Sequence, residues 1–265
     1  MIRTNQQRVV MPIATSSVFR GHLTIIATLI AAHVILQIAL YGSGYTDYND
    51  LRSVFDLDRE HSLPNLLSAF AIAVTAAAAA FAARTADSRL MKRGWIFAAC
   101  VMLFLALDEG AGLHDALSGK VGRVLSAGGA HGVLFSAWVI PYSIAFVATA
   151  AILARFALAL PKETRWGLLI AGWVYALAAI GLELPEGYVA DHAMASGLAL
   201  EAIDNLPVMV MMHTVEETGE MLAFALALRT ILQHIVRQTI VPAILLVDRR
   251  PHAVHRIDAG LVPAE

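Results

Sequence analysis

The segment Leu206–Ile231, LPVMVMMHTVEETGEMLAFALALRTI, is long and apolar enough to cross a hydrocarbon core of about 30 Å. Its middle holds four ionisable residues, His213, Glu216, Glu217 and Glu220. At about 100° per residue, their side chains share an arc of roughly 100° on one face of a helix. An acid at the centre of a bilayer costs about 2.5–3.5 kcal/mol, so acids are kept there mainly for a function. The segment therefore predicts a membrane-spanning helix that carries a functional site.

The composition of the whole chain is that of a membrane protein. Of its 265 residues, 58% are hydrophobic and 15% are charged, and the mean hydropathy is +0.66. A soluble domain normally has about 25% charged residues. The net charge of −2 indicates no nucleic-acid partner. Cys100 is the single cysteine, which excludes a disulfide framework and a cysteine-based metal site.

Six apolar segments are long enough to span a bilayer. They are His22–Tyr41, Leu63–Ala83, Gly94–Leu117, Val133–Leu160, Trp166–Leu184 and Leu206–Ile231. We therefore predict an all-α integral membrane protein with a six-transmembrane helix bundle over residues 21–235, and a kink at Pro141 near the middle of the fourth span. Residues 1–20 form an N-terminal segment without a convincing cleavage site. Residues 236–265 form a short tail whose apolar run Ile240–Val247 is too short to span.

The basic residues predict the orientation of the bundle. One set of connecting segments and termini holds 15 of the 19 lysines and arginines. These are Arg3, Arg8, Arg20, Arg84, Arg89, Lys92, Arg93, Arg155, Lys162, Arg165, Arg229, Arg237, Arg249, Arg250 and Arg256. The other set holds only Arg52, Arg59, Lys120 and Arg123. The positive-inside rule places the first set, and with it both termini, in the cytoplasm.

A second group of ionisable residues lies on the third span, in the stretch LDEGAGLHD from Leu107 to Asp115. Facing helices that supply carboxylates and imidazoles are typical of di-iron and di-manganese sites, in which Glu-x-x-His pairs recur. Here the order is reversed, as His213-x-x-Glu216. We expect the acids of the third span to come within a metal's reach of those of the sixth span. The predicted metal ligands are Asp108, Glu109, His114, His213, Glu216, Glu217 and Glu220, with His33, Asp115 and Glu183 as secondary candidates and Glu216 and Glu109 as candidate catalytic residues.

Each of these residues also has a purely structural interpretation. The sixth-span stripe can be a hydrogen-bonded seam that only fixes helix packing. The third-span group can be a helix end that faces water. His33 alone is more typical of a buried histidine with satisfied hydrogen bonds than of a ligand. Glu183 and Glu186 flank Pro185, which predicts a helix end where both acids are solvated.

Other sequence features exclude several classes of membrane protein. No lysine lies within any predicted span, which argues against a retinal Schiff base. There is no glycine-rich phosphate loop before a helix and no His-Glu-x-x-His zinc motif. The acids of the sixth span remain the main indication of function.

Three short motifs resemble those of a group of uncharacterised bacterial multi-pass membrane proteins. They are LDRE at residues 57–60 with LP at 63–64, LDE at 107–109 with HD at 114–115, and EE at 216–217 with EM at 220–221. The resemblance covers most of the chain. It implies a shared polar centre and a location in the bacterial inner membrane, but it supplies no substrate. The group has Glu where this chain has Asp115.

Two functions are consistent with these residues. The first is a metal-dependent membrane enzyme that binds iron, manganese or zinc for redox or hydrolytic chemistry on a lipid-like or quinone-like substrate from the bilayer. The second is a proton- or cation-coupled transporter in which the acids titrate. The third possibility is a purely structural subunit of an oligomer or larger membrane complex, which would carry out neither a reaction nor transport.

Overall fold

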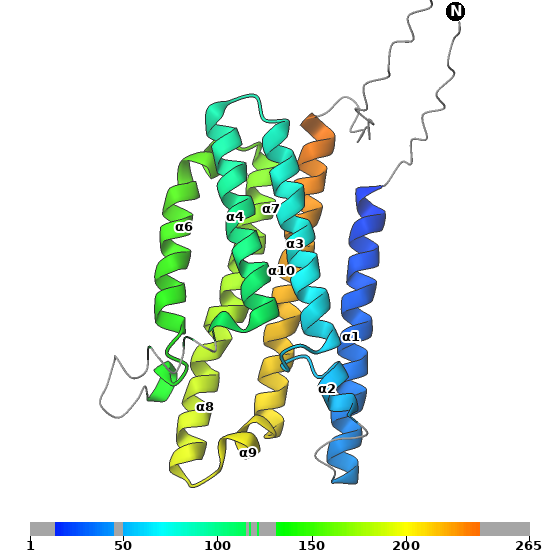
Figure 1. The fold of residues 1–265 in the computed structure, drawn as a ribbon, viewed down its shortest axis with the longest axis vertical. Coiled ribbons are helices and arrows are strands. Elements are labelled where there is room, and N and C mark those ends of the chain that lie inside the picture. The colour runs from blue at the N-terminus through cyan, green and yellow to red at the C-terminus, as the bar shows by residue number, and fades with distance from the viewer. Residues whose placement is uncertain (1–13, 45–49, 115–116, 118–120, 122–130, 239–265) are drawn as a thin grey trace, which may run out of the picture.

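The computed structural model describes residues 14–44, 50–114, 117, 121 and 131–238. These residues are almost entirely helical and include no strand (Figure 1). The helices are α1 Thr15–Ser43, α2 Leu51–Phe55, α3 Leu63–Arg84, α4 Arg89–Ala111, the 3-10 turn η1 Gly132–Leu134, α6 Val139–Ala159, α7 Lys162–Ala176, the π-helical η2 Leu177–Leu182, α8 Glu183–Ala195, α9 Leu200–Asp204 and α10 Pro207–Gln238. Asp115 and the run Ile240–Val247 lie outside the described residues.

Six helices of the described part are long and apolar enough to cross a membrane, which confirms the predicted number of spans. They are α1, α3, α4, α6, the continuous helix Lys162–Ala195 and α10. Many large apolar side chains on them are exposed, such as Ile35 at 67%, Ile144 at 65% and Trp173 at 62%. Side chains of this kind require a lipid environment, and the protein is therefore a multi-pass membrane protein in contact with the bilayer.

Local signals fix the ends of α3 and α4. The hydroxyl of Ser62 accepts a hydrogen bond from the backbone N–H of Asn65 at 3.3 Å, and a proline follows in the first turn of α3. At its C-terminus, α4 ends at Ala111 because Gly112 adopts a left-handed conformation with φ 56°. The carboxylate of Glu60 also packs against Gly112, where a side chain would not fit. The prediction that this span continues to Leu117 was wrong.

The fourth span begins later than predicted. Helix α6 starts at Val139 instead of Val133, after the short turn η1. Pro141 therefore lies in the first turn of α6, where a missing backbone N–H costs little. The prediction of a kink at Pro141 near the middle of the span was wrong for this reason.

The fifth span is longer than predicted and does not end at Pro185. The chain stays helical from Lys162 to Ala195, through α7, η2 and α8. A proline inside a helix cannot donate to the preceding turn, and its ring crowds the carbonyl four residues earlier. The π-helical turns of η2, Leu177–Leu182, come directly before this position and widen the helix there. The helix thus passes Pro185 and carries Glu183 and Glu186 inside the bundle.

Helix α10 is the central element of the bundle. It packs against α7 on one side and against α1 and α3 on others, and α3 also packs closely against α4 (Figure 1). At one end, Trp95 of α4 is fully buried among Phe156, Ile231 and Ile235. In contrast, α6 stands at the edge of the bundle with little of its surface buried. The polar face of α10 meets η2 and α8.

Candidate functional site

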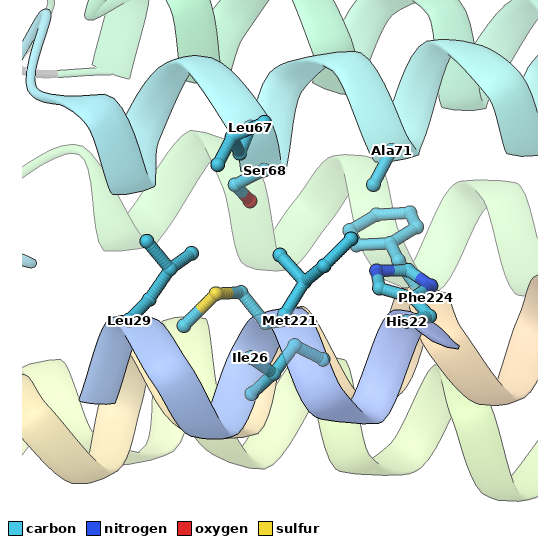
Figure 2. Close-up of a pocket in the computed structure, with 9 residues that line it drawn as sticks. His22, Ile26, Leu29, Leu67, Ser68, Ala71, Met221 and Phe224 are labelled. Carbon is cyan, nitrogen blue, oxygen red and sulfur yellow. The ribbon is translucent and has the colours of Figure 1, made fainter. Parts of the chain in front are cut away.

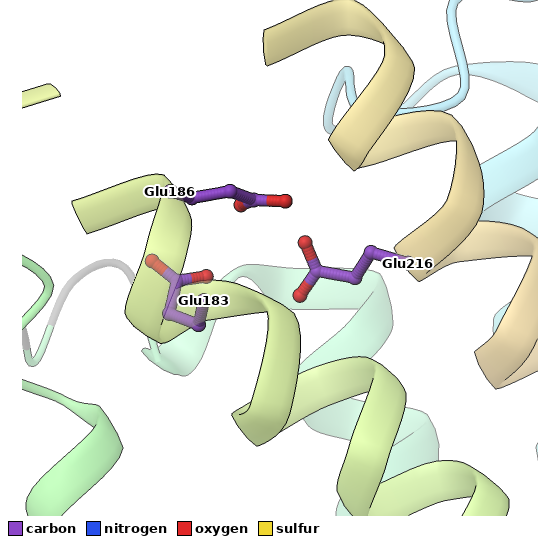
Figure 3. Close-up of side chains that lie close together, drawn as sticks. All are labelled: Glu183, Glu186 and Glu216. Atoms are coloured by element: carbon purple, nitrogen blue, oxygen red, sulfur yellow. The ribbon is translucent and has the colours of Figure 1, made fainter. Parts of the chain in front are cut away.

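Three carboxylates from two helices converge in the interior of the bundle. Glu183 and Glu186 lie on one face of α8, and Glu216 lies on α10 opposite them (Figure 3). One ligand oxygen of each residue lies within 4.8 Å of the other two. Within the part of the chain that the structure describes, no other set of three His, Cys, Asp or Glu residues is this compact. We refer to these three residues as the carboxylate triad.

The π-helical segment and a close helix contact bring the triad together. Glu183 is the first residue after η2, so the widened turn sets the direction in which Glu183 and Glu186 point. On α10, Gly219 follows Glu216 by one turn and faces Ala178 of η2. A Cβ atom placed on Gly219 would lie 2.7 Å from the Cβ of Ala178. Only glycine permits this approach of the two backbones without a shift.

Two of the three acids of the triad, Glu186 and Glu216, are buried. Glu186 is 4% exposed and Glu216 is 9% exposed. Oε1 of Glu186 is buried and has no hydrogen-bond partner among the described residues. A buried carboxylate oxygen without a partner is unfavourable by several kcal/mol in apolar surroundings. Three acids at this separation require shared protons or a bound cation.

His213 connects the triad to the surface of the protein. Its Nε2 lies 3.5 Å from Oε2 of Glu186, and its Nδ1 lies 3.0 Å from Oδ2 of Asp58. Asp58 belongs to the segment between α2 and α3, and its side chain is 46% exposed. A carboxylate that holds one imidazole nitrogen while the other faces a metal site is a common arrangement around metal ions.

Glu217 and Glu220 lie beside the triad and face the third span. Glu217 interacts electrostatically with Glu109, Glu220 and Glu186, and Glu220 interacts with Glu109 and Asp108. The acids of the third and sixth spans therefore influence one another through their charges, and the closer approach within reach of one metal ion stays a prediction. The third-span acids nevertheless do not belong to the compact triad.

Glu109 and Asp108 have their own partners. Nδ2 of Asn65 donates to the backbone oxygen of Glu109 at 2.7 Å and to Oε1 at 3.4 Å. The hydroxyl of Tyr142 donates to Oδ1 of Asp108 at 2.7 Å, and the backbone N–H of His114 donates to the same oxygen at 3.0 Å. Nδ1 of His114 lies 3.4 Å from Oδ2 of Asp108. This second group joins α3, α4 and α6.

His33 is buried with partners at both ring nitrogens. Its Nε2 lies 3.2 Å from Oγ1 of Thr214, and the backbone N–H of Leu57 donates to Nδ1 at 3.1 Å. Oδ1 of Asp56 lies 3.3 Å from the same Nδ1, and Nε of Arg52 donates to Oδ2 of Asp56 at 3.0 Å. Burial raises the pKa of Asp56, but its interactions with His33 and Arg52 outweigh burial and hold that pKa below the ordinary 3.8. The structure thus places His33 away from the triad, where it joins α1 to α10.

Two residues of the site were not identified from the sequence. Glu186 was interpreted only as a solvated acid at a helix end, and Asp58 only as part of a motif. The three-residue spacing of Glu183 and Glu186 does place both on one helix face, and this signal could have identified Glu186. Nothing in the sequence indicates that Asp58 contacts His213, because the contact depends on how the segment between α2 and α3 folds back against α10.

Comparisons with known proteins give a family but no function. The family described as "Domain of unknown function (DUF8692)" matches residues 23–235. This range runs from the third turn of α1 to the last turn of α10 and includes every residue of the triad. No curated protein and no solved structure matches the chain. An assignment of function therefore has to come from the geometry of the site.

Proposed function

We propose that this chain, which belongs to the DUF8692 family, binds a metal ion inside the membrane at Glu183, Glu186 and Glu216. His213 supplies a nitrogen ligand through Nε2, and Asp58 orients its ring. The bound metal serves redox or hydrolytic chemistry on a lipid-like or quinone-like substrate that enters from the bilayer.

The observation that carries this proposal is the buried, partnerless Oε1 of Glu186 within a compact set of three acids. Oxygens that bind one ion at about 2.0–2.2 Å lie roughly 3–4 Å apart. The triad atoms are within 4.8 Å of one another, so a small inward movement of the side chains suffices. A divalent cation would offset the charge of the acids and would give Glu186 the partner that it lacks.

The ligand set restricts the metal and its chemistry. Carboxylate oxygens together with one imidazole nitrogen suit iron, manganese or zinc. Iron or manganese would support redox chemistry on a quinone-like substrate. Zinc would instead activate a water molecule for hydrolysis of a lipid ester or amide. The identity of the metal in the purified protein therefore separates the two reaction types.

We also propose that both termini lie in the cytoplasm and that the membrane is the inner membrane of a bacterium. The distribution of basic residues supports this orientation. It places Asp58 on the outer side of the bundle, because the segment between α2 and α3 lies opposite the end where α1 begins (Figure 1). Water and protons would then reach the triad from outside through Asp58 and His213.

Metal analysis of the purified protein tests the proposal. We expect a metal ion in the wild-type protein and its loss in Glu216→Gln and Glu186→Gln, because an amide is a weaker ligand than a carboxylate. Glu163→Gln is the matched control, since Glu163 is on the fifth span with its side chain 68% exposed and its nearest basic partner is Arg237 at 3.7 Å. A wild-type protein that holds no metal after purification and reloading contradicts the proposal, and so does equal metal content in all four proteins.

One observation favours a proton-coupled transporter as the second candidate. Titratable groups follow one another from the exposed Asp58 through His213 and Glu186 to Glu216. Beyond the triad, Glu217 and Glu220 continue toward Glu109. If proton flux into liposomes follows an imposed pH gradient and stops in Glu216→Gln while no metal is bound, this second function replaces the first.

A further inference from the structure

Two hollows between the helices differ greatly in size. The first lies between α1, α3 and α10, where Ile26, Leu29, Leu67 and Met221 pack against one another (Figure 2). Its volume is about 10 Å³, which is room for roughly one water molecule. The second lies at the end of the bundle where α3 turns into α4, and its volume is about 170 Å³. Of the two, the second alone can hold a ligand larger than water.

The second hollow, which we call the end pocket, lies between the ends of α3, α4, α6 and α10. Its apolar lining is Ala82, Ala86, Met91, Trp95, Ala159 and Pro161. Three of these residues are alanines, whose small side chains leave the space open. Asp87, Ser88 and Gln238 also line the pocket and are exposed, so the pocket opens to water at this end of the bundle. In the proposed orientation this is the cytoplasmic side.

The size and the walls of the end pocket favour a flat ring. An engineered cavity of about 150 Å³ holds one benzene molecule. The end pocket, at about 170 Å³, therefore has room for one six-membered ring with small substituents. The thioether of Met91 and the indole of Trp95 are side chains that make favourable contacts with aromatic rings.

His234 offers an unused ring nitrogen to the end pocket. Its side chain is buried, and its Nδ1 lies 3.2 Å from Oγ1 of Thr164. Its Nε2 has no partner among the described residues, and it does not belong to the unpaired atoms that are sealed from solvent, which there are Nε1 of Trp95 and Oε1 of Glu186. Nε2 is therefore reached from the pocket. The Trp95 ring lies 5.0 Å from the His234 ring between centroids, so its unpaired Nε1 is a second unused nitrogen at this end.

The charge of the lining restricts the ligand further. Asp87 is its one carboxylate, and no lysine or arginine is among the lining residues. An anionic ring would be repelled by Asp87. A quinone has only acceptors and would give the carboxylate no hydrogen bond. A neutral ring with both a donor and an acceptor on its edge suits Asp87 and also His234, whose Nε2 donates or accepts according to its tautomer.

We propose that the end pocket binds a neutral nitrogen heterocycle that carries an amino group, as adenine and cytosine do. A ring nitrogen pairs with Nε2 of His234, and the amino group donates to the carboxylate of Asp87. The faces of the ring contact the apolar walls. The same ring edge is offered by a free base and by the base of a nucleoside.

The end pocket is separate from the carboxylate triad. His234 and Glu216 are 18 residues apart on α10, which corresponds to about 27 Å along the helix. Phe224, Leu228 and Ile231 lie between them and are buried apolar residues. The proposal is therefore independent of metal binding at the triad.

Titration calorimetry of the detergent-purified protein tests the proposal. Adenine and cytosine should bind to the wild-type protein. Purine, which lacks the amino group, should bind about tenfold more weakly than adenine. Benzoate, an anionic ring of similar size, should not bind. Adenosine distinguishes the two sources of the ring, because affinity at least equal to that of adenine indicates a nucleoside and weaker affinity indicates a free base.

Three variants test the walls and the two polar contacts. Ala159→Leu fills the pocket and should abolish binding of adenine. Ala154→Leu is the matched control, because Ala154 is an exposed alanine of the same helix that does not line the pocket. Asp87→Ala should bind adenine as weakly as purine. His234→Asn keeps a polar group near Thr164 but removes Nε2, and it should weaken the binding of adenine and purine alike, by about tenfold.

Four results would overturn the proposal. They are failure of both adenine and cytosine to bind to the wild-type protein up to their solubility, benzoate binding as tight as that of adenine, undiminished adenine binding in Ala159→Leu, and an unchanged preference for adenine over purine in Asp87→Ala. Ala159 and Asp87 are exposed, so their variants are expected to fold and decide the outcome even if His234→Asn does not fold.

Discussion

Nδ1 of His213 lies 3.0 Å from Oδ2 of Asp58, so a residue in the middle of the polar face of α10 is held by a residue from the segment before α3. The partly exposed Asp58 is thereby linked to the buried triad. A substitution at Asp58 should therefore change the affinity of the triad for a metal ion.

Asp58→Asn should lower metal affinity about 10- to 100-fold, the usual effect of removing a carboxylate that orients a histidine ligand. The amide can still hydrogen-bond the ring, but it does not favour the charged or strongly polarised imidazole. Titration of the metal-free protein with iron, manganese or zinc measures the change. Arg59→Gln, at the exposed neighbouring position, should leave the affinity unchanged. Equal affinity in Asp58→Asn and the wild-type protein would show that Asp58 does not act on the site.

Glu217→Gln and Glu220→Gln should insert normally and keep most of the bound metal, because neither residue belongs to the triad. Glu216→Gln, on the same face of the same helix, should lose it. Metal content per protein, measured on all three variants purified in parallel, makes the comparison. If Glu217→Gln loses metal as fully as Glu216→Gln does, the ion lies deeper, between α4 and α10.

Gly219→Ala should destabilise the protein by about 1–3 kcal/mol, because the added methyl group overlaps Ala178. It should also lower metal content, since the two helices that carry the triad are pushed apart. Gly172→Ala is the control on the fifth span, where an added Cβ meets nothing within 4 Å. That control should be neutral or slightly stabilising because alanine has the higher helix propensity. Chemical unfolding in detergent compares the stability of the two variants. Equal stability would mean that Gly219 and Ala178 are not in close contact in solution.

Acid should weaken the attachment of α1 through Asp56. Its pKa is below the ordinary value of 3.8 in the folded protein, so its contribution to stability is fully present above that value. The contribution is lost as the pH falls below 3.8 and through the lower folded pKa. Stability measured against pH should therefore fall in this acidic range for the wild-type protein and fall less steeply for Asp56→Asn. The same slope in both proteins would assign the acid sensitivity to other groups.

The proposed orientation predicts which sides of the membrane can be labelled. In a Cys100→Ala background, cysteines at Arg59 and Ser196 should react with a membrane-impermeant reagent added to intact cells. A cysteine at Asp87, in the exposed turn between α3 and α4, should react only after the membrane is opened. The reverse pattern would place both termini outside, and the triad would then be reached from the cytoplasm.

The six spans could be predicted because a chain in lipid must satisfy every backbone hydrogen bond internally, so apolar length alone indicates a helix. The ends of the spans were harder to predict. Gly112 ends α4 through a left-handed conformation, and this choice depends on the nearby Glu60 as well as on the glycine itself. A proline such as Pro185 normally ends a helix, but here π-helical turns precede it and α8 continues past it.

The candidate site could be predicted in part. The polar face of α10 follows from residue spacing alone, and Glu216 and His213 lie at the centre of the site that the structure shows. The partners of Glu216 could not be derived in this way, because they depend on which neighbouring helix faces α10. The carboxylates and the histidine of the third span made it the predicted partner, with Glu183 only a secondary candidate, but α4 packs mainly on α3, and Glu183 and Glu186 of the fifth span form the compact set with Glu216.

The site also depends on the wide turns of η2, because the number of residues in each turn sets the direction in which the following residues point. In a π-helix each turn takes up one residue more than in an α-helix. If the same six residues, Leu177–Leu182, formed an ordinary α-helix, all that follows would be rotated by about 100°. Hydropathy, length and insertion of the span would hardly change, yet Glu183 and Glu186 would turn away from Glu216. The phase of this helix, rather than the identity of the six apolar residues in η2, therefore determines whether the three acids can meet.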